Sequence, residues 1–374
     1  MPDGGFEMRP RRVSLVLAGG IALGAYEAGA YSALHEETAL QPGWVAGSSI
    51  GAVTSVIIAG NRPERRIERL RQFWEMTADD PYPLTSFWLG HKQSGFWREA
   101  QNQKSVWDAL LFGRPGLFRP RLAPGKQAGV QDVPALFDLA PLRRRLTDLV
   151  DFELLNNGPV RLSISCTDVI NGDRVVFDTG RGDTIGPDHV LASSALLPLF
   201  AAVEVNGRLL ADGALSANTP LDLVLEDDRD QELLCFVVEL FARQGSRPHT
   251  LAAAANRAGD LAFGNQTRRI LEGREREYRL RGLIGQLAAH LPDAVREDPD
   301  VASILAEGRS SRATVATIAY RGGLDEAGLF KGFDFSRATL NDRWAAGKAA
   351  MQHAMSAVEQ QAGDPAPALA IIDA

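Results

Sequence analysis

Two strand–turn–helix units at the start of the chain constrain its fold more than any other feature of the sequence. The apolar run at residues 13–17 leads into the glycine-rich turn "AGGIALG" and a segment with helical character over 24–38. The short apolar run at 44–46 leads into "GSSIG" and the apolar helical stretch "IGAVTSVIIAG". Strands that alternate with helices pair in parallel, and their connecting helices cover the faces of the sheet. We therefore expect both turns side by side at the carboxyl edge of one sheet, where ligands bind in such folds.

The same alternation continues along the chain and predicts an α/β protein with a largely parallel central sheet flanked by helices. Further strands are predicted at 160–167, 173–178, 208–212, 232–240 and 312–320, and long helices at 249–289 and 336–360. A chain of 374 residues, 45% hydrophobic and 23% charged, is long enough to bury a large core. Its ends, 1–11 and 361–374, are rich in Pro, Gly, Ala and Asp, and we expect them to be flexible.

Charge and cysteine content exclude several classes of protein. The 40 Lys and Arg residues against 47 Asp and Glu give a net charge of −7, so we expect no nucleic-acid partner. Cys166 and Cys235 each lie in an apolar strand-like run, which favours buried thiols over a disulfide or a metal pair. Neither a secretory signal nor a run of about 20 apolar residues is found, so we expect a cytoplasmic protein.

The glycine-rich turn can serve three purposes. A phosphate-binding P-loop needs Lys and then Ser or Thr directly after its last glycine, and neither follows Gly24. A dinucleotide fingerprint needs G-x-G-x-x-G, whereas Gly19 and Gly20 are adjacent here and Ile21 stands at the wrong place. The third use is to direct backbone N–H groups at a developing oxyanion, and this requires a nucleophile nearby.

The second turn supplies a candidate nucleophile. "GSSIG" matches the G-x-S-x-G pattern with Ser49 at its centre. The small residues Gly47 and Gly51 allow a strand to turn sharply into a helix, so that Ser49 projects from the corner near the helix N-terminus, where negative charge is favoured. A tight turn of small residues without any chemistry gives the same pattern, so the pentapeptide alone leaves both interpretations open.

A nucleophilic serine needs a base, and the sequence points to a carboxylate. None of the six histidines lies in a small-residue turn at the end of a predicted strand. Asp212 does, at the end of the strand 208–212 and before Gly213. A carboxylate there can accept the serine proton if burial raises its pKa towards neutral pH. An ordinary Asp-Gly turn is the alternative interpretation.

Four motifs in this order carry a family resemblance. "AGGIALGAYEAG", "GSSIG", "ASSALLPLF" and "DGALSANTP" resemble the patatin-like phospholipase family over residues 12–240. "KGFDFSRATLNDRWAAG" (331–347) resembles a bacterial subgroup with a C-terminal extension. The resemblance implies a three-layer sandwich, with a catalytic core at 12–240 and a mainly helical extension at 241–360 packed on it.

The resemblance also implies residue roles. Ser49 would be the nucleophile and Asp212 the base of a Ser–Asp dyad, and the turn Gly19, Gly20 and Ile21 would form the oxyanion hole. The implied activity is that of a serine acyl hydrolase, which cleaves lipid ester bonds through a covalent acyl-enzyme and needs no metal or cofactor. The residues leave open which ester is cleaved (phospholipid, acylglycerol or storage polyester) and the oligomeric state.

The turn departs from the family pattern at one position. The third glycine of the family turn is Ile21 here. Because a β-branched residue resists positive φ, we predict a negative φ at Ile21 and a side chain at the mouth of the pocket. This departure is also the basis of the alternative function, a non-catalytic lipid-binding or scaffold protein on the same fold.

Aromatic residues are concentrated between the elbow and the candidate base. We interpret the segment 73–118 as a helical cap that lines an acyl channel or touches a lipid surface, here the inner membrane surface. The core of a helical subdomain is the alternative interpretation. The aromatic residues are Phe73, Trp74, Tyr82, Phe87, Trp88, Phe96, Trp97, Trp107, Phe112 and Phe118.

Overall fold

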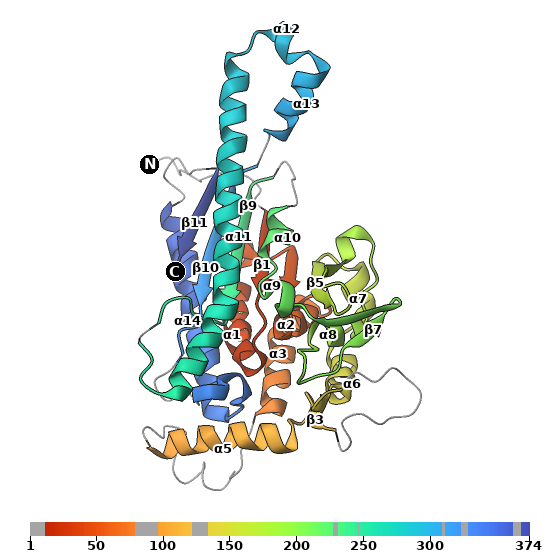
Figure 1. The fold of residues 1–374 in the computed structure, drawn as a ribbon, viewed down its shortest axis with the longest axis vertical. Helices are drawn as coiled ribbons and strands as arrows, with labels where there is room; N and C mark the ends of the chain where they lie inside the picture. The colour runs from red at the N-terminus through yellow and green to blue at the C-terminus, as the bar shows by residue number, and fades with distance from the viewer. Residues whose placement is uncertain are drawn as a thin grey trace.

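A single nine-stranded sheet lies between two layers of helices (Figure 1). The computed structural model describes residues 12–78, 96–121, 134–226, 231–245, 247–308, 311–322, 328–361 and 368–374. The predicted α/β fold with a largely parallel central sheet is confirmed.

The sheet has the strand order β11-β10-β9-β1-β2-β5-β8-β7, and β6 pairs with β5 beside this path. Strands β11 to β5 in this order are parallel, whereas β6, β7 and β8 are antiparallel to their neighbours. The strands are β1 (Arg12–Leu17), β2 (Trp44–Gly47), β5 (Arg161–Asp168), β6 (Arg174–Asp178), β7 (Val203–Val205), β8 (Arg208–Asp212), β9 (Leu233–Glu239), β10 (Ala313–Ala319) and β11 (Leu369–Asp373). Outside the sheet, β3 (Arg119–Pro120) pairs with β4 (Phe137–Asp138).

Helices cover both faces of the sheet. A hydrophobic core lies on each face of the sheet, between the strands and the helices. Successive residues of β1 point to opposite faces, so that Leu15 and Leu17 pack into one core and Val16 into the other. The helices are α1 (Gly24–Glu36), α2 (Ile50–Ala59), α3 (Pro63–Thr77), α5 (Phe96–Phe112), α6 (Ala140–Leu149), α7 (Phe152–Asn157), α8 (Pro187–Ser193), α9 (Ala214–Ala217), α10 (Leu221–Leu225), α11 (Leu251–His290), α12 (Asp293–Arg296), α13 (Pro299–Glu307) and α14 (Arg337–Gln361). Short 3-10 helices are η1 (Ile21–Leu23), η2 (Thr38–Leu40), η3 (Thr179–Arg181) and η4 (Gly328–Phe333).

The C-terminal part of the chain contributes strands to the sheet as well as helices that pack on it. β10 lies between β9 and β11, and the backbone N–H of Ala374 donates to the Thr317 carbonyl at 2.9 Å. The expectation that 361–374 is flexible is wrong for residues 369–373, because this short apolar run forms the edge strand β11. The flexibility expected of residues 1–11 lies outside the described residues.

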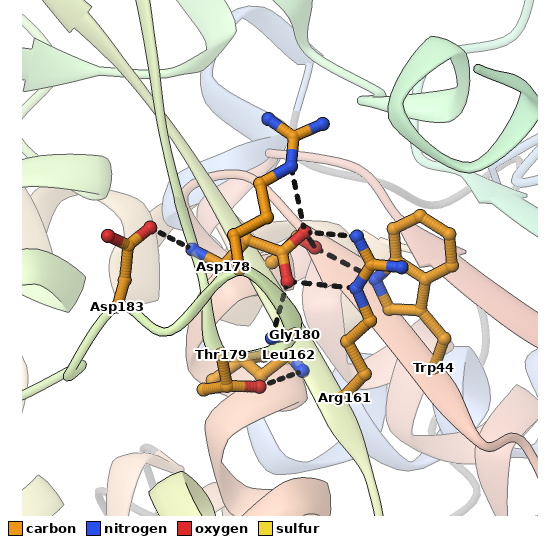
Figure 2. Close-up of polar contacts among 9 residues, drawn as sticks. Trp44, Arg161, Leu162, Asp178, Thr179, Gly180 and Asp183 are labelled. Carbon is orange, nitrogen blue, oxygen red and sulfur yellow. Dashed lines mark hydrogen bonds and ion pairs between the residues drawn. The ribbon is translucent and has the colours of Figure 1, made fainter. Parts of the chain in front are cut away.

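A polar network fixes the amino ends of β2 and β5, opposite the carboxyl edge (Figure 2). The Arg161 guanidinium donates twice to the Asp178 carboxylate, each at 2.8 Å, and lies 3.7 Å above the centre of the Trp44 ring. Ser163 also donates to Asp178, at 3.0 Å. Burial alone would raise the pKa of Asp178, but the hydrogen bonds and charge of Arg161 outweigh it and hold this pKa below its usual value.

Two strands of opposite direction meet end to end along one edge of β5. β2 pairs with the first half of β5 as far as Gly47 opposite Ile164, and β8 pairs with the last part, with Asp212 opposite Cys166. β6 occupies the other edge of β5 over both stretches. The carboxyl ends of β2 and β8 therefore face each other, and the residues that follow β2 meet the last residue of β8.

The aromatic segment 73–118 divides into buried and exposed residues. Phe73, Trp74 and Phe118 are buried and belong to the main hydrophobic core, as the alternative interpretation expects. Trp107 and Phe112 on α5 are 57% and 74% exposed. Tyr82, Phe87 and Trp88 lie outside the described residues, as do the side chains of Phe96 and Trp97.

Candidate active site

Ser49 lies in a sharp turn between β2 and α2, as the G-x-S-x-G pattern predicts. Its backbone has φ 55° and ψ −124°, and it is the N-cap residue of α2. The strand and helix approach so closely that a Cβ on Gly47 would lie 2.4 Å from the Gly51 carbonyl carbon, and a Cβ on Gly51 would lie 2.3 Å from the Leu17 carbonyl oxygen. Glycine is therefore required at both positions, and Ser49 is held at the corner in a conformation that non-glycine residues rarely adopt.

Asp212 ends β8 directly against this corner. Its side chain is 1% exposed, and it accepts hydrogen bonds from the Ser49 side chain and, at 2.8 Å, from the Ala214 backbone N–H. Burial raises the pKa of Asp212 to about 7, although both hydrogen bonds lower it. The pKa of this carboxyl group thus lies near neutral pH, which suits a general base.

The glycine-rich turn packs against the serine. A Cβ on Gly19 would lie 2.9 Å from the Ser49 Cβ and 2.6 Å from the Asn218 Oδ1, so only glycine fits there. The Gly19 N–H donates to the Asn218 carbonyl at 3.1 Å, so it is already used. Within the described part of the chain, no backbone partner is found for the N–H groups of Gly20 and Ile21. These two groups can serve as oxyanion donors.

Ile21 has φ 53°, so the prediction of a negative φ is wrong. Tertiary contacts override the local preference of this β-branched residue. Ile21 begins η1, whose first turn closes with the Leu23 N–H donating to the Gly20 carbonyl at 3.1 Å. The Ile21 side chain is half-buried and lies beside Gly332 of η4, where an added Cβ would be 3.8 Å from the Ile21 Cβ. The isoleucine therefore takes the left-handed conformation that a glycine would supply without strain.

Three further residues hold the backbone of the site, and sequence analysis did not assign them roles. The Ser49 N–H donates to the Ser193 Oγ at 3.1 Å, and this hydroxyl donates to the Ser165 carbonyl at 2.8 Å. Ser194 donates to the Ser49 carbonyl at 3.4 Å, and Asn218 Nδ2 to the Gly19 carbonyl at 3.3 Å. The signal for them was present, since Ser193 and Ser194 lie in "ASSALLPLF" and Asn218 lies in "DGALSANTP".

A buried glutamate also lies next to the site. Glu27 on α1 is fully buried and accepts a hydrogen bond from Thr54 of α2 at 3.2 Å. Burial raises the pKa of Glu27 well above its usual value. Burial therefore favours the uncharged form of this side chain, whose hydrogen bond with Thr54 links α1 to α2.

Among the described residues, no hydrogen bond joins a histidine to Ser49 or Asp212. His189 on α8 accepts a hydrogen bond from the Gly186 N–H at 3.0 Å, and its ring packs edge-on against Phe177. His91 lies outside the described residues. Over the described ranges, no three His, Cys, Asp or Glu side chains form a group that could hold a metal ion, and no helix is long and apolar enough to cross a membrane.

Comparisons with known proteins bear on the two halves of the chain separately. A family model described as patatin-like phospholipase matches residues 15–225, and one described as patatin phospholipase matches residues 261–366. The structure is similar to VipD from Legionella pneumophila, with 15% sequence identity and a TM-score of 0.41, over 93% of this chain and 67% of that one. A search of curated proteins found no match.

Proposed function

Because the chain belongs to the patatin-like phospholipase family, we propose that it hydrolyses lipid esters with Ser49 as nucleophile and Asp212 as general base. Membership of the family implies a lipid acyl hydrolase. The observation that carries the assignment of residues is the hydrogen bond between Ser49 and a buried carboxyl group whose pKa is about 7. A dyad of this kind needs no imidazole, because the carboxylate itself can take the serine proton.

In the proposed reaction the Ser49 Oγ attacks the ester carbonyl carbon while its proton passes to the Asp212 carboxylate. The negative charge that forms on the carbonyl oxygen is stabilised by the backbone N–H groups of Gly20 and Ile21. When the carbon–oxygen bond breaks, the alcohol leaves with the proton from Asp212 and the acyl group stays on Ser49. Water, deprotonated by Asp212, then releases the fatty acid and restores the serine.

The conformation of Ile21 supports activity over the non-catalytic alternative. That alternative assumes that an isoleucine cannot reproduce the turn that a third glycine would form. With φ 53°, Ile21 has the backbone conformation available to glycine, and an oxyanion hole uses backbone N–H groups only. The isoleucine side chain therefore does not by itself prevent this turn from supplying oxyanion donors.

We further propose that α5 touches the lipid surface that holds the substrate. Trp107, Leu111 and Phe112 are exposed near the C-terminal end of this helix. α5 crosses the end of the molecule opposite α12 (Figure 1). The N–H of Phe335, two residues after η4, donates to Ser105 of α5 at 3.2 Å. Exposed aromatic side chains favour a membrane–water interface, so this face fits a bilayer or micelle surface.

The proposed function is tested with a fluorophosphonate probe and a panel of lipid esters. Wild-type protein is expected to take up one probe molecule per chain and to release fatty acid from at least one phospholipid, acylglycerol or polyester in the panel. Protein that folds, takes up no probe and cleaves none of these esters would be a lipid-binding protein on the same fold.

A further inference from the structure

One arginine ties the turn around Ile21 to the C-terminal part of the chain. Arg343 of α14 is fully buried, and its guanidinium donates to the Ala22 carbonyl at 3.1 Å. The same group donates to the carbonyls of Asp334 at 3.1 Å and of Lys331 at 2.9 Å. Ala22 directly follows Ile21 in η1, whereas Lys331 lies in η4 and Asp334 directly after it. The arginine thus joins three main-chain oxygens from two distant segments.

The segment 331–336, which contains two of the carbonyls bound by Arg343, also contacts two other helices. Lys331 forms an ion pair with Asp260 of α11 at 2.7 Å. Ser336, just after η4, donates to the Asn102 side chain of α5 at 2.9 Å. Because α11 and α5 are long helices, η4 is a fixed support, and the Ala22 carbonyl is the end of the network that reaches the glycine-rich turn.

The turn needs such a support because of its strained residue. Ile21 has φ 53°, a region that β-branched residues avoid, and nothing in its own side chain favours it. A turn of this kind relaxes towards negative φ unless surrounding contacts hold it. Two contacts do so: the Ile21 side chain lies beside Gly332, and the next carbonyl is held by Arg343.

We propose that Arg343 is a positioning residue, which holds Ile21 at positive φ and thereby keeps the Gly20 and Ile21 N–H groups directed at the reacting carbonyl. This inference rests on the proposed function. It gives the C-terminal segment from Lys331 to Arg343 a part in catalysis, although none of its residues touches the substrate. Tertiary contacts of this segment stabilise at Ile21 the positive φ that a glycine would adopt without strain.

The choice of arginine fits this role. A guanidinium carries five N–H donors in a planar fork and can bond several carbonyls at once, whereas an ammonium group at the same place cannot match this geometry. A buried charge is costly without partners, and here the main-chain carbonyls supply them. The Arg343→Lys variant therefore keeps the positive charge but cannot donate to all three carbonyls at once.

A double-mutant cycle between positions 343 and 21 tests the proposal, with hydrolysis of a short soluble ester as the readout. In the wild-type background, Arg343→Lys is expected to lower kcat by about tenfold to a hundredfold with KM within about threefold, as for loss of transition-state stabilisation. In the Ile21→Gly background the same substitution should lower kcat by less than about threefold, because glycine holds positive φ without help.

Arg66→Lys is the matched control, because Arg66 is also a buried arginine that donates to a main-chain carbonyl, that of Asn61 at 3.0 Å. It also donates to the Tyr31 hydroxyl of α1 at 3.3 Å, and neither partner belongs to η1. Its effect on kcat should be the same in both backgrounds. If Arg343→Lys does not fold, Lys331→Met can be used instead, because it removes the ion pair that joins η4 to Asp260 of α11. It is expected to lower kcat more in the wild-type background than in the Ile21→Gly background, by a smaller factor than Arg343→Lys. A loss that is equal in both backgrounds overturns the proposal.

Hydrogen exchange separates this proposal from the proposed function. The amide of Leu23 in η1 and that of Gly24 at the start of α1 are expected to exchange at least about tenfold faster in Arg343→Lys than in wild type. Their exchange rates should be unchanged in Arg66→Lys. This readout does not need turnover, so it decides the matter even if the wild-type protein cleaves no ester. Unchanged exchange in a folded Arg343→Lys variant overturns the positioning role.

Discussion

The side chain of Ser49 is hydrogen-bonded to the carboxyl group of Asp212 because β2 and β8 run towards each other along the same edge of β5. The two strands end opposite Ile164 and Cys166 of β5, so their last residues converge on one point of the sheet. The proposed nucleophile after one parallel strand and the proposed base at the end of an antiparallel strand are thus brought together by strand pairing.

Ser49 is expected to be the serine that reacts with a fluorophosphonate. Only a hydroxyl with a base in hydrogen-bond contact is activated, and Ser49 has that contact with Asp212. Intact-mass analysis should show one adduct on the wild-type protein and none on Ser49→Ala. Ser216→Ala, a change at an exposed serine close to Asp212 in the sequence, should keep the adduct. An adduct that persists in Ser49→Ala contradicts the assignment.

Activity is expected to depend on a carboxylate and to rise with pH through about 7. Asp212 acts as a base only when it is ionised, and burial raises its pKa to about 7. For a short ester, kcat/KM should fall about tenfold per pH unit below about pH 6 and level off above about pH 8. Asp212→Asn should remove most activity at every pH.

The same interpretation predicts that no histidine is essential. Each of the six His→Ala variants should keep its activity within about tenfold, equivalent to a barrier change of about 1.4 kcal/mol. One histidine variant as inactive as Asp212→Asn would reveal a triad and refute the dyad.

Asp212→Asn is expected to stabilise the fold above neutral pH. The pKa of Asp212 is about 7 in the folded protein against 3.8 for an unperturbed aspartate, so the folded state binds the proton more tightly. Its contribution to stability is fully present below about pH 4 and is lost as pH rises through about 7. At pH 8 the variant should unfold at a higher temperature than wild type. Its free energy of unfolding should be larger by an amount on the order of a few kcal/mol. At pH 4 the difference should be small.

Asp178→Asn is the control for this prediction, with the opposite sign. Arg161 holds the pKa of Asp178 below its usual value despite burial, so the charged form stabilises the fold. This contribution is present above the unfolded pKa and is lost as pH falls through the folded one. Asp178→Asn should therefore unfold at a lower temperature than wild type at pH 8. Thermal unfolding of both variants at pH 8 is compared with that of wild type. If Asp212→Asn, like Asp178→Asn, unfolds at a lower temperature than wild type, the raised pKa of Asp212 is contradicted.

Motifs in the sequence were sufficient to propose a candidate site, but they could not predict which contacts hold its backbone. Strand–turn–helix alternation predicted β1 and β2 side by side, as observed. The G-x-S-x-G motif and the place of Asp212 at a predicted strand end made Ser49 and Asp212 candidates, and the family resemblance implied their roles. The backbone of Ile21 was predicted wrongly because its conformation depends on η4 and Arg343, which lie some 300 positions further along the chain. β11 was missed because its short apolar run follows a stretch rich in Pro, Gly and Ala.

Gly19→Ala is expected to inactivate the enzyme without unfolding it. The added methyl group would lie 2.9 Å from the Ser49 Cβ, so the serine or the turn must shift. Displacing the oxyanion donors from the reacting carbonyl should lower kcat by about a hundredfold or more, the scale of losing one such donor. Gly259→Ala on α11, where a Cβ meets no atom within 4 Å, should keep full activity. A Gly19→Ala variant with wild-type kcat would exclude this turn from the oxyanion hole.

Activity on vesicles is expected to depend on the exposed face of α5, whereas activity on a soluble ester is not. Trp107 and Phe112 are 57% and 74% exposed, and each contributes apolar area that a lipid surface can cover. The double variant Trp107→Gln/Phe112→Gln should lower hydrolysis of phosphatidylcholine vesicles by about tenfold or more, since burying one such side chain contributes about 1.5–3 kcal/mol. Its kcat/KM on a short soluble ester should stay within about twofold of wild type, because neither residue contacts Ser49 or Asp212 among the described residues. Leu287→Gln, at an exposed position near the C-terminal end of α11, should change neither activity. Equal losses on vesicles and on the soluble ester would show that α5 supports the fold of the site and does not bind lipid.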